Sequence, residues 1–279
     1  MDSGLRDEAA RTRRIMAAGH ETVYHEAGSG RPVVLLHGSG PGVSAWSNWS
    51  RTLPELARHH RVLAPDIAGF GRTSFQEDAT YGIKLWVRHL FGFLDALAIP
   101  SAVLVGNSFG GGLALAATLR DPSRVDGLVL LGTPAGTFTM TEGLRAGWHY
   151  EPDLDEMRRI LRLFPHDPDL VTDEMVRARY EASARPGAQD AYRKLIPEPA
   201  PGDTPIRGVP EERLRTIDRP TLVVHGREDG VIPVELGWRL AREIPSADLH
   251  VFGHCGHWVQ LERHAAFTAL VDDFAGRLS

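Results

Sequence analysis

The segment AVLVGNSFGGGLALAA, residues 102–117, places a G-x-S-x-G sequence between an apolar run and a stretch of small residues. The apolar run is typical of a buried strand, and the stretch after the motif is typical of a helix. Gly106 and Gly110 permit a tight turn between the two, which leaves the hydroxyl of Ser108 exposed at the end of the strand. The segment therefore predicts a strand, a sharp turn that carries a serine, and a helix. The alternative is an ordinary glycine-rich turn with an incidental serine.

The same order of apolar run, glycine-containing turn and helix-like segment recurs along the chain. The apolar runs are 33–36, 62–64, 102–105, 128–131, 221–224 and 249–252. They are continuously apolar rather than alternating, as expected for strands that are buried on both faces of a parallel sheet. Helix-like segments such as 82–98 and 109–120 lie between them. The pattern predicts an α/β fold with a mostly parallel sheet flanked by helices.

The strand pattern stops between about 136 and 213, where no β-like run occurs. The apolar spacing there predicts helices at 153–164, 173–184 and 188–195. Because ligands bind at the carboxyl ends of parallel strands, an insertion at this point is expected to cover the site as a lid. The predicted division is a core of 20–135 and 214–279, a helical cap of 136–213, and an N-terminal extension of 1–19.

Composition excludes several classes of protein. With 42% hydrophobic and 24% charged residues, the 279-residue chain is typical of a folded globular protein. Its single cysteine, Cys255, excludes an intrachain disulfide and a cysteine metal cluster. The net charge of −5 argues against nucleic-acid binding. No run of 18 apolar residues and no apolar N-terminal segment occur, so we expect no membrane contact, no signal peptide and a cytoplasmic location.

A serine at its ordinary pKa is a poor nucleophile and needs a base oriented by a third group. His257 lies in the loop after the last apolar run, and Asp229 follows the run at 221–224. The order Ser108, Asp229, His257 is the order expected for the catalytic triad of an α/β-hydrolase. The sequence therefore predicts a serine-dependent hydrolase.

Other residues compete for these roles. His254 is close to His257, Glu228 is adjacent to Asp229, and Asp66 follows another strand in a Pro65-Asp66-x-x-Gly69 setting typical of a turn. A metal site around His254 is disfavoured because no further ligands are supplied. Neither a GxGxxG sequence nor a Lys-Ser/Thr pair follows a strand, so no nucleotide cofactor is expected, and no cofactor of any kind.

The second donor of an oxyanion hole is expected in the loop after an earlier strand. The loop HGSGPG, residues 37–42, fits because its glycines allow backbone N–H groups to approach a substrate oxygen closely. We assign the oxyanion hole to the N–H groups of Ser39 and Phe109.

Several longer segments resemble one family. They are HGSGPGVSAWSNW (37–49), PDIAGFGRTS (65–74), GNSFGGGLAL (106–115), RYEAS (179–183), HGREDGVIP (225–233) and HVFGHCGHWVQLE (250–262). The chain resembles the meta-cleavage-product hydrolases, which are α/β-hydrolases that cut a carbon–carbon bond in ring-fission products of catechols. The HGSGPG loop and the segment MTEGLRAGW (140–148) are most similar to 2-hydroxymuconic semialdehyde hydrolases. The resemblance begins near Thr22. It implies an eight-stranded sheet and a homodimer or larger homo-oligomer.

The resemblance also implies roles for individual residues. Asn48 and Asn107 match residues that contact the enolate end of the substrate, and Arg179 matches the arginine that holds its carboxylate. Trp258 matches an aromatic residue that lines this end, and Gly40 is grouped with these substrate-binding residues. A solvated arginine, a turn-supporting asparagine and a core tryptophan are the alternatives for Arg179, Asn107 and Trp258.

The expected reaction is hydrolysis of a small anionic dienoate in aromatic catabolism. A 2-hydroxy-6-oxohexa-2,4-dienoate would give 2-hydroxypenta-2,4-dienoate and a carboxylic acid. A general serine carboxylesterase and a ligand-binding receptor with little turnover are the alternatives. Candidates for contact with the C6 substituent are Phe138, Met140, Trp148, Tyr150 and Tyr180.

Overall fold

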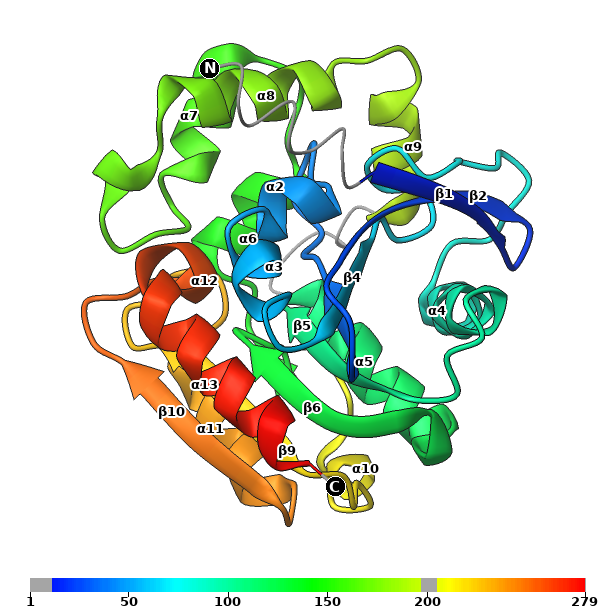
Figure 1. Ribbon diagram of the computed structural model, residues 1–279. Helices are drawn as coiled ribbons and strands as arrows, with labels where there is room; N and C mark the ends of the chain where they lie inside the picture. The colour runs from blue at the N-terminus through cyan, green and yellow to red at the C-terminus, as the bar shows by residue number, and fades with distance from the viewer. Residues whose placement is uncertain (1–11, 197–204, 279) are drawn as a thin grey trace.

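A central sheet of eight strands runs through the computed structural model, which describes residues 12–196 and 205–278 (Figure 1). The strands are β1 (Thr12–Ala17), β2 (His20–Ala27), β3 (Pro32–Leu36), β4 (Arg61–Pro65), β5 (Ala102–Asn107), β6 (Val125–Leu131), β9 (Thr221–Gly226) and β10 (Ala247–Phe252). Their order in the sheet is β1-β2-β4-β3-β5-β6-β9-β10. β2 pairs antiparallel with both β1 and β4, and all the other neighbouring strands of this sheet pair in parallel. The predicted mostly parallel sheet is confirmed.

Each parallel strand contains one of the apolar runs found in the sequence. The runs are continuously apolar because both faces of the sheet are covered. In β3, Val33 and Leu35 pack into one core cluster, whereas Val34 and Leu36 pack into the other. All residues of β5 are buried. Alternate side chains of β3 therefore pack into two cores on opposite faces of the sheet, and neither face of the strand is exposed to solvent.

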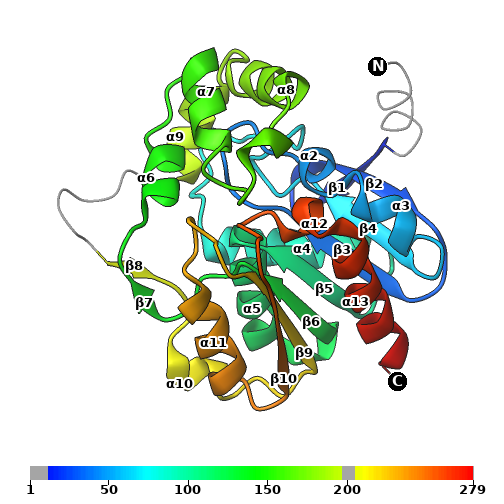
Figure 2. The same ribbon diagram turned by 90° about the vertical axis from the view of Figure 1, so that its left-hand side faces the viewer.

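Helices form a layer on each face of the sheet (Figure 2). One layer contains α4 (Ile83–Ala96), α5 (Phe109–Arg120), α10 (Glu211–Leu214) and α11 (Val234–Glu243). The other contains α2 (Ala45–Trp49), α3 (Thr52–Leu56), α12 (Val259–Glu262) and α13 (His264–Arg277). The segments 82–98 and 109–120, predicted as helices, correspond to α4 and α5. None of the helices in residues 12–196 and 205–278 is long and apolar enough to cross a lipid bilayer.

The chain between β6 and β9 adds a separate group of helices, which Figure 2 shows above the sheet. They are α6 (Glu142–Trp148), α7 (Leu154–Leu161), α8 (Asp173–Ser183) and α9 (Ala188–Leu195), with a short 3-10 helix at Pro168–Leu170 beside α7. A second 3-10 helix, Pro122–Arg124, lies in the core between α5 and β6. The last three α-helices match the predicted ones. Residues 197–204 of the predicted cap lie outside the described residues.

Two features of this region differ from the sequence-based expectation. A two-residue ribbon of β7 (Thr137–Phe138) and β8 (Ile206–Arg207) occurs where no strand was expected. Strands of two residues are too short to show any periodicity. Helix α6 was also not among the predicted helices, because it has only seven residues and two of them are glycines.

The N-terminal part also differs from the prediction. Residues 12–17, which were assigned to an extension, form the edge strand β1 and pair with β2 in a hairpin. Only the inward-facing Ile15 and Ala17 give β1 an apolar face, too little to signal a strand in the sequence. The core therefore includes residues from Thr12 onward, and residues 1–11 lie outside the described part.

Candidate active site

Ser108 occupies the turn between β5 and α5, in a conformation that few residues adopt. Its φ is +54° and its ψ is −114°, and its N–H donates to the carbonyl of Leu131 at 2.8 Å. A side chain at 106 would collide with the backbone of Gly110, and one at 110 would collide with the backbone of Leu36. The two glycines of the motif are therefore needed because strand and helix approach each other so closely. The predicted strand, strained turn and helix are all present.

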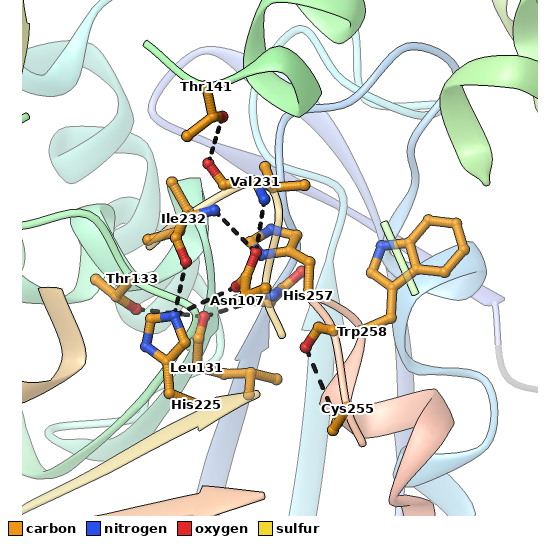
Figure 3. A network of polar contacts seen from close by, with 12 residues as sticks. Asn107, Leu131, Thr133, Thr141, His225, Val231, Ile232, Cys255, His257 and Trp258 are labelled. Carbon is orange, nitrogen blue, oxygen red and sulfur yellow. Dashed lines mark hydrogen bonds and ion pairs between the residues drawn. The ribbon is translucent and has the colours of Figure 1, made fainter. Parts of the chain in front are cut away.

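Asp229 and His257 form a buried pair at the ends of β9 and β10 (Figure 3). His257 Nδ1 donates to Asp229 Oδ2 at 2.7 Å. Asp229 Oδ1 accepts the N–H groups of Val231 and Ile232, each at 2.8 Å. Because Nδ1 carries the proton that the carboxylate accepts, Nε2 of the neutral ring has a free lone pair. The pair can therefore accept a proton at Nε2.

The electrostatics of the pair favour an ionised Asp229. Burial by itself raises the pKa of this carboxyl, but the charge of His257 and hydrogen bonds from His225 and His257 outweigh burial. Together they hold the pKa of Asp229 well below its ordinary range. An anionic Asp229 stabilises the imidazolium that forms when His257 takes a proton.

The residues that could have replaced His257 or Asp229 in the triad make other contacts. His254 is exposed, and its ring lies against His166. Glu228 accepts the N–H of Cys255 at 3.0 Å. Asp66 accepts two backbone N–H groups, each at 2.7 Å, and so braces a turn. Burial raises the pKa of the Cys255 thiol to about 12, which leaves this cysteine protonated and unreactive near neutral pH.

The two predicted oxyanion donors follow the ends of neighbouring strands. β3, which precedes Ser39, pairs with β5, which precedes Phe109. β4 and β5 lie on opposite sides of β3, so the order of strands reverses here, as at the ligand-binding crevice of open α/β sheets. Phe109 is the first residue of α5, and its N–H therefore has no acceptor within the helix. The positive end of the helix dipole favours a developing anion at the same place.

One cavity brings most of the predicted residues together. It is lined by Ser39, Gly40, Asn48, Asn107, Ser108, Arg179, His257 and Trp258. Two predicted residues do not line it: Asp229 supports His257, and the ring of Phe109 packs between Phe70 and Trp86. The backbone of Phe109, rather than its side chain, is the part assigned to the oxyanion hole.

Arg179 supplies a positive charge at one end of the cavity. It projects from α8, and its Nε donates to the carbonyl of Pro41 at 2.8 Å. Burial lowers the pKa of Arg179 to about 10, so the guanidinium remains charged at neutral pH. None of the described residues that line the cavity carries a carboxylate. A half-buried guanidinium that faces no carboxylate in the cavity lining is suited to binding a carboxylate from a ligand.

The glycines of the 37–42 loop make room for this arginine. A side chain at Gly40 would come within 2.9 Å of Arg179 Nη2, and one at Gly42 would collide with the backbone carbonyl of Arg179. Besides its part in the proposed oxyanion hole, the loop therefore serves as the surface on which α8 packs.

The two asparagines differ in their free hydrogen-bonding capacity. Asn48 accepts the N–H of Gly38 at 3.4 Å, whereas its Nδ2 is buried without a partner among the described residues. Asn107 Nδ2 donates to the carbonyl of Leu131 at 3.4 Å. An unsatisfied buried donor is costly, so Asn48 is ready to donate to a ligand oxygen. Asn107 both lines the cavity and supports the turn.

The other end of the cavity is apolar, and most of its residues were missed in the sequence. The lining there is Gly143, Leu144, Gly147, Trp148, Phe164 and Val231. Tyr192 also lines the cavity, but it lies near Arg179. Trp258 stacks on Phe164, with ring centroids 5.2 Å apart. The sequence does contain one signal for these residues. Gly143 and Gly147 are four residues apart, as are Leu144 and Trp148, so that a helix would present all four on one face.

Of the five residues expected to contact a C6 substituent, only Trp148 is among the described residues that line this cavity. Tyr150 and Tyr180 pack within the helices above the sheet, and Phe138 packs in a small cluster beside them. Met140 is buried without lining the cavity. The size and apolar character of a side chain in the sequence therefore do not show whether it lies in the core or lines the pocket.

Comparison with known proteins gives a consistent set of relatives. The model of the alpha/beta hydrolase fold family matches residues 31–264. The chain is 48% identical to the 2-hydroxy-6-oxo-2,4-heptadienoate hydrolase of Pseudomonas putida (strain F1), over 94% of this chain and 95% of that one. It is 49% identical to the 2-hydroxymuconate semialdehyde hydrolase of Pseudomonas sp. (strain CF600), over 94% and 93%.

Solved structures agree with the sequence relatives. The structure superimposes on a meta-cleavage product hydrolase from Pseudomonas fluorescens IP01 with a TM-score of 0.90 and 46% identity, covering 96% of this chain and 98% of that one. The similarity extends over the sheet and the helices inserted between β6 and β9 alike.

Proposed function

Since the chain belongs to the alpha/beta hydrolase fold family and, within it, to the meta-cleavage-product hydrolases, we propose that it hydrolyses a carbon–carbon bond in ring-fission products of catechols. The substrate class is a 2-hydroxy-6-oxohexa-2,4-dienoate with hydrogen or a small alkyl group at C6. The products are 2-hydroxypenta-2,4-dienoate and a short carboxylic acid. The observation that carries this proposal is a half-buried Arg179 that has no carboxylate partner among the described residues and lines the same cavity as Ser108 and His257.

The charged end of the cavity fits the carboxylate end of such a substrate. Arg179 binds the carboxylate, and the unpartnered Nδ2 of Asn48 donates to the neighbouring oxygen at C2. Asn107 lies at the same end and contacts the enolate. A planar guanidinium can form two parallel hydrogen bonds with a carboxylate, which fixes the substrate in register with Ser108.

The reaction needs an electron sink because a carbon leaving group is poor. Ketonisation of the dienol places a ketone at C2, which accepts the electron pair released when the C5–C6 bond breaks. The N–H groups of Ser39 and Phe109 stabilise the negative charge that develops on the C6 oxygen. C5 gains a proton and C6 gains the hydroxyl of water, which balances the hydrolysis.

The triad can act in two ways at C6. In one, Ser108 attacks the carbonyl and water releases the acyl group. In the other, His257 activates a water that attacks directly, and Ser108 assists. Rapid quenching followed by mass spectrometry of the intact protein separates these routes, since only the first leaves an acyl group on Ser108.

The proposal is tested by mixing the protein with the yellow ring-fission product of catechol or 3-methylcatechol. We expect the absorbance to decay over many turnovers per site, and Ser108→Ala to reduce the rate by at least about 1000-fold. A protein that leaves the absorbance unchanged, or a Ser108→Ala variant that is equally active, would contradict the proposal.

Two further measurements distinguish the alternatives. Rapid turnover of p-nitrophenyl acetate without turnover of the dienoate indicates a general carboxylesterase. Binding of the dienoate with fewer than one turnover per site indicates a receptor. The cytoplasmic location and the homodimeric or larger assembly remain predictions from the sequence, and sedimentation velocity measures the latter.

A further inference from the structure

Asp229 contacts a second histidine, His225, besides His257. Figure 3 shows His225 and His257 close to the loop that carries Val231 and Ile232. His225, in the last part of β9, places its Nε2 3.3 Å from Asp229 Oδ2 and 2.9 Å from the carbonyl oxygen of Ile232. The side chains of His225 and Asp229 are both completely buried. No role in the proposed hydrolysis has so far been assigned to this ring.

The surroundings of His225 fix its tautomer. Both neighbours of Nε2 are acceptors, an ionised carboxylate and a carbonyl, so Nε2 must carry the proton. The other ring nitrogen, Nδ1, is buried without a partner among the described residues. Gly237 of α11 closes off this side, since a side chain there would lie 2.7 Å from Nδ1. A proton on Nδ1 would find no acceptor, and the ring is therefore a single, fixed donor.

His225 supplies the fourth hydrogen-bond donor to the carboxylate of Asp229. Asp229 Oδ1 accepts the two N–H groups of Val231 and Ile232, and Oδ2 accepts His257 and His225. The loop amides hold one oxygen, whereas the hydrogen-bond donors to the other are, among the described residues, the two histidines. Because the proton on His225 Nε2 is shared with Ile232, the ring also ties Oδ2 to the loop that carries Asp229.

We propose that His225 is a positioning residue for the triad: its Nε2–H holds Asp229 Oδ2 where that oxygen accepts the hydrogen bond from His257 Nδ1–H. The inference rests on the proposed roles of Ser108, Asp229 and His257, and it does not depend on which substrate the enzyme cleaves. His225 itself does not line the catalytic cavity among the described residues. Its removal is therefore expected to slow the chemical step and to leave substrate binding unchanged.

The test compares substitutions that keep or remove the donor. In His225→Gln the side-chain amide can reach Asp229 from the position of Nε2. His225→Met fills a similar volume without a donor, and the amide of His225→Asn is too short to reach. The readout is the rate at which a fluorophosphonate modifies Ser108, together with kcat and KM for the dienoate and the melting temperature.

We expect His225→Met and His225→Asn to lower the phosphonylation rate and kcat by about tenfold, the loss of one hydrogen bond to a charged group. KM should stay within about twofold. His225→Gln should restore the rate to within about threefold of the parent protein. Either donor-free variant suffices if the other fails to fold.

Two results would overturn the inference: a folded donor-free variant that reacts at the parent rate, or equal slowing of the Gln and donor-free variants. The second result would mean that the ring only fills space. Failure of the proposed function looks different, because the parent protein would then be phosphonylated at Ser108 and yet leave the dienoate intact.

Discussion

At the scale of single residues, the two ends of the cavity are built from different kinds of side chain. The polar end depends on two groups that keep free hydrogen-bond donors: the guanidinium of Arg179, which is only partly used by its bond to Pro41, and Nδ2 of Asn48, which has no partner among the described residues. The apolar end depends on the absence of side chains at Gly143 and Gly147 of α6. Each end can therefore be changed separately.

Replacement of Arg179 should affect anionic substrates selectively. We expect Arg179→Gln to lower kcat/KM for the dienoate by about 100-fold, because a charge-assisted contact of about 1.5–3 kcal/mol is lost. The rate with a neutral aryl ester should change by less than about threefold. Steady-state kinetics with both substrates measures the ratio. An unchanged ratio would show that this arginine does not hold the carboxylate.

Replacement of Gly147 should narrow the pocket without harming the fold. A methyl group at 147 would meet no heavy atom within 4 Å, although the residue is buried and lines the cavity. We expect Gly147→Ala to raise the ratio of kcat/KM for the substrate with hydrogen at C6 to kcat/KM for the substrate with isopropyl by about tenfold. One or two methylene groups that no longer fit a pocket change kcat/KM by about this much. The melting temperature should not fall, since alanine favours a helix by about 1 kcal/mol over glycine.

Gly143→Ala is the matched control for this change. A methyl group at 143 would lie 2.8 Å from Val231 Cγ2, so this variant should be destabilised. The measurement is a panel of C6 substituents together with thermal unfolding of both variants. Equal melting temperatures for the two variants would contradict the assignment of free space at Gly147.

The polar residues of the site were predictable because each follows an apolar strand or lies in a recognisable motif. Ser108, Asp229 and His257 follow three different strands, and the sheet brings the carboxyl ends of these strands together. Phe164 and Val231 were not predictable, because an apolar side chain in a loop carries no chemical signal. His225 was missed for a related reason: it stands within a strand, directly after the apolar residues Leu222, Val223 and Val224.

At the scale of elements, α12 anchors the loop that carries His257. The carboxylate of Glu262 accepts the N–H groups of Gly256 at 2.9 Å and of Trp258 at 3.2 Å. It also accepts the N–H of His166 at 2.8 Å, in the segment that follows α7. In the same place the N–H of His257 donates to the carbonyl of Phe164 at 2.7 Å. One side chain thus joins the core loop to the inserted helices.

We expect Glu262→Ala to lower the free energy of unfolding by about 1–3 kcal/mol, because several backbone donors lose their acceptor. The value of kcat should fall severalfold, since the loop around His257 is no longer fixed. Glu262→Gln, which keeps one acceptor oxygen, should have the smaller effect. Urea denaturation and steady-state kinetics measure both quantities.

The control for Glu262 is Glu235→Gln, a change to an exposed carboxylate on α11. This control should change stability by less than about 0.5 kcal/mol. If Glu262→Ala behaves like the control, Glu262 does not anchor the loop.

The elements that the sequence predicted are those with a long, regular pattern. Six strands contain an apolar run long enough to be seen in the sequence, and the helices α4, α5, α7, α8 and α9 are long enough to show a helical pattern. The strands β1, β7 and β8 are defined by partners elsewhere in the chain, and local sequence does not contain this information. Helix α6 is held by packing around the cavity rather than by helix propensity.

At the scale of the whole molecule, buried histidines make the stability of the fold depend on pH. Burial lowers the pKa of His37 to about 4 and that of His89 to about 3. His37 Nε2 accepts the N–H of Ile67 at 3.0 Å, and His89 Nε2 contacts Thr22 Oγ1 at 2.8 Å. Both rings are therefore neutral in the folded protein near pH 6, whereas a histidine in the unfolded chain has a pKa of about 6.5.

Between about pH 6.5 and pH 4 the unfolded chain binds more protons than the folded one, so stability falls as the pH is lowered through this range. Each of the two histidines contributes a slope of up to about 1.4 kcal/mol per pH unit, and the loss for His89 continues to about pH 3. Urea denaturation at pH 7.5, 6 and 5 measures the slope. His89→Gln should reduce it, and a free energy of unfolding that is equal at pH 7.5 and pH 5 would contradict the prediction.

The left-handed backbone at Ser108 has a consequence for how this chain can change in evolution. A residue with a side chain at this φ costs about 1–3 kcal/mol, out of a total stability of about 5–15 kcal/mol for a domain. Glycine at 108 would relieve that cost and end the chemistry at the same time. Selection for heat resistance alone would therefore favour an inert protein, and only a continuing demand for turnover keeps a serine at this position.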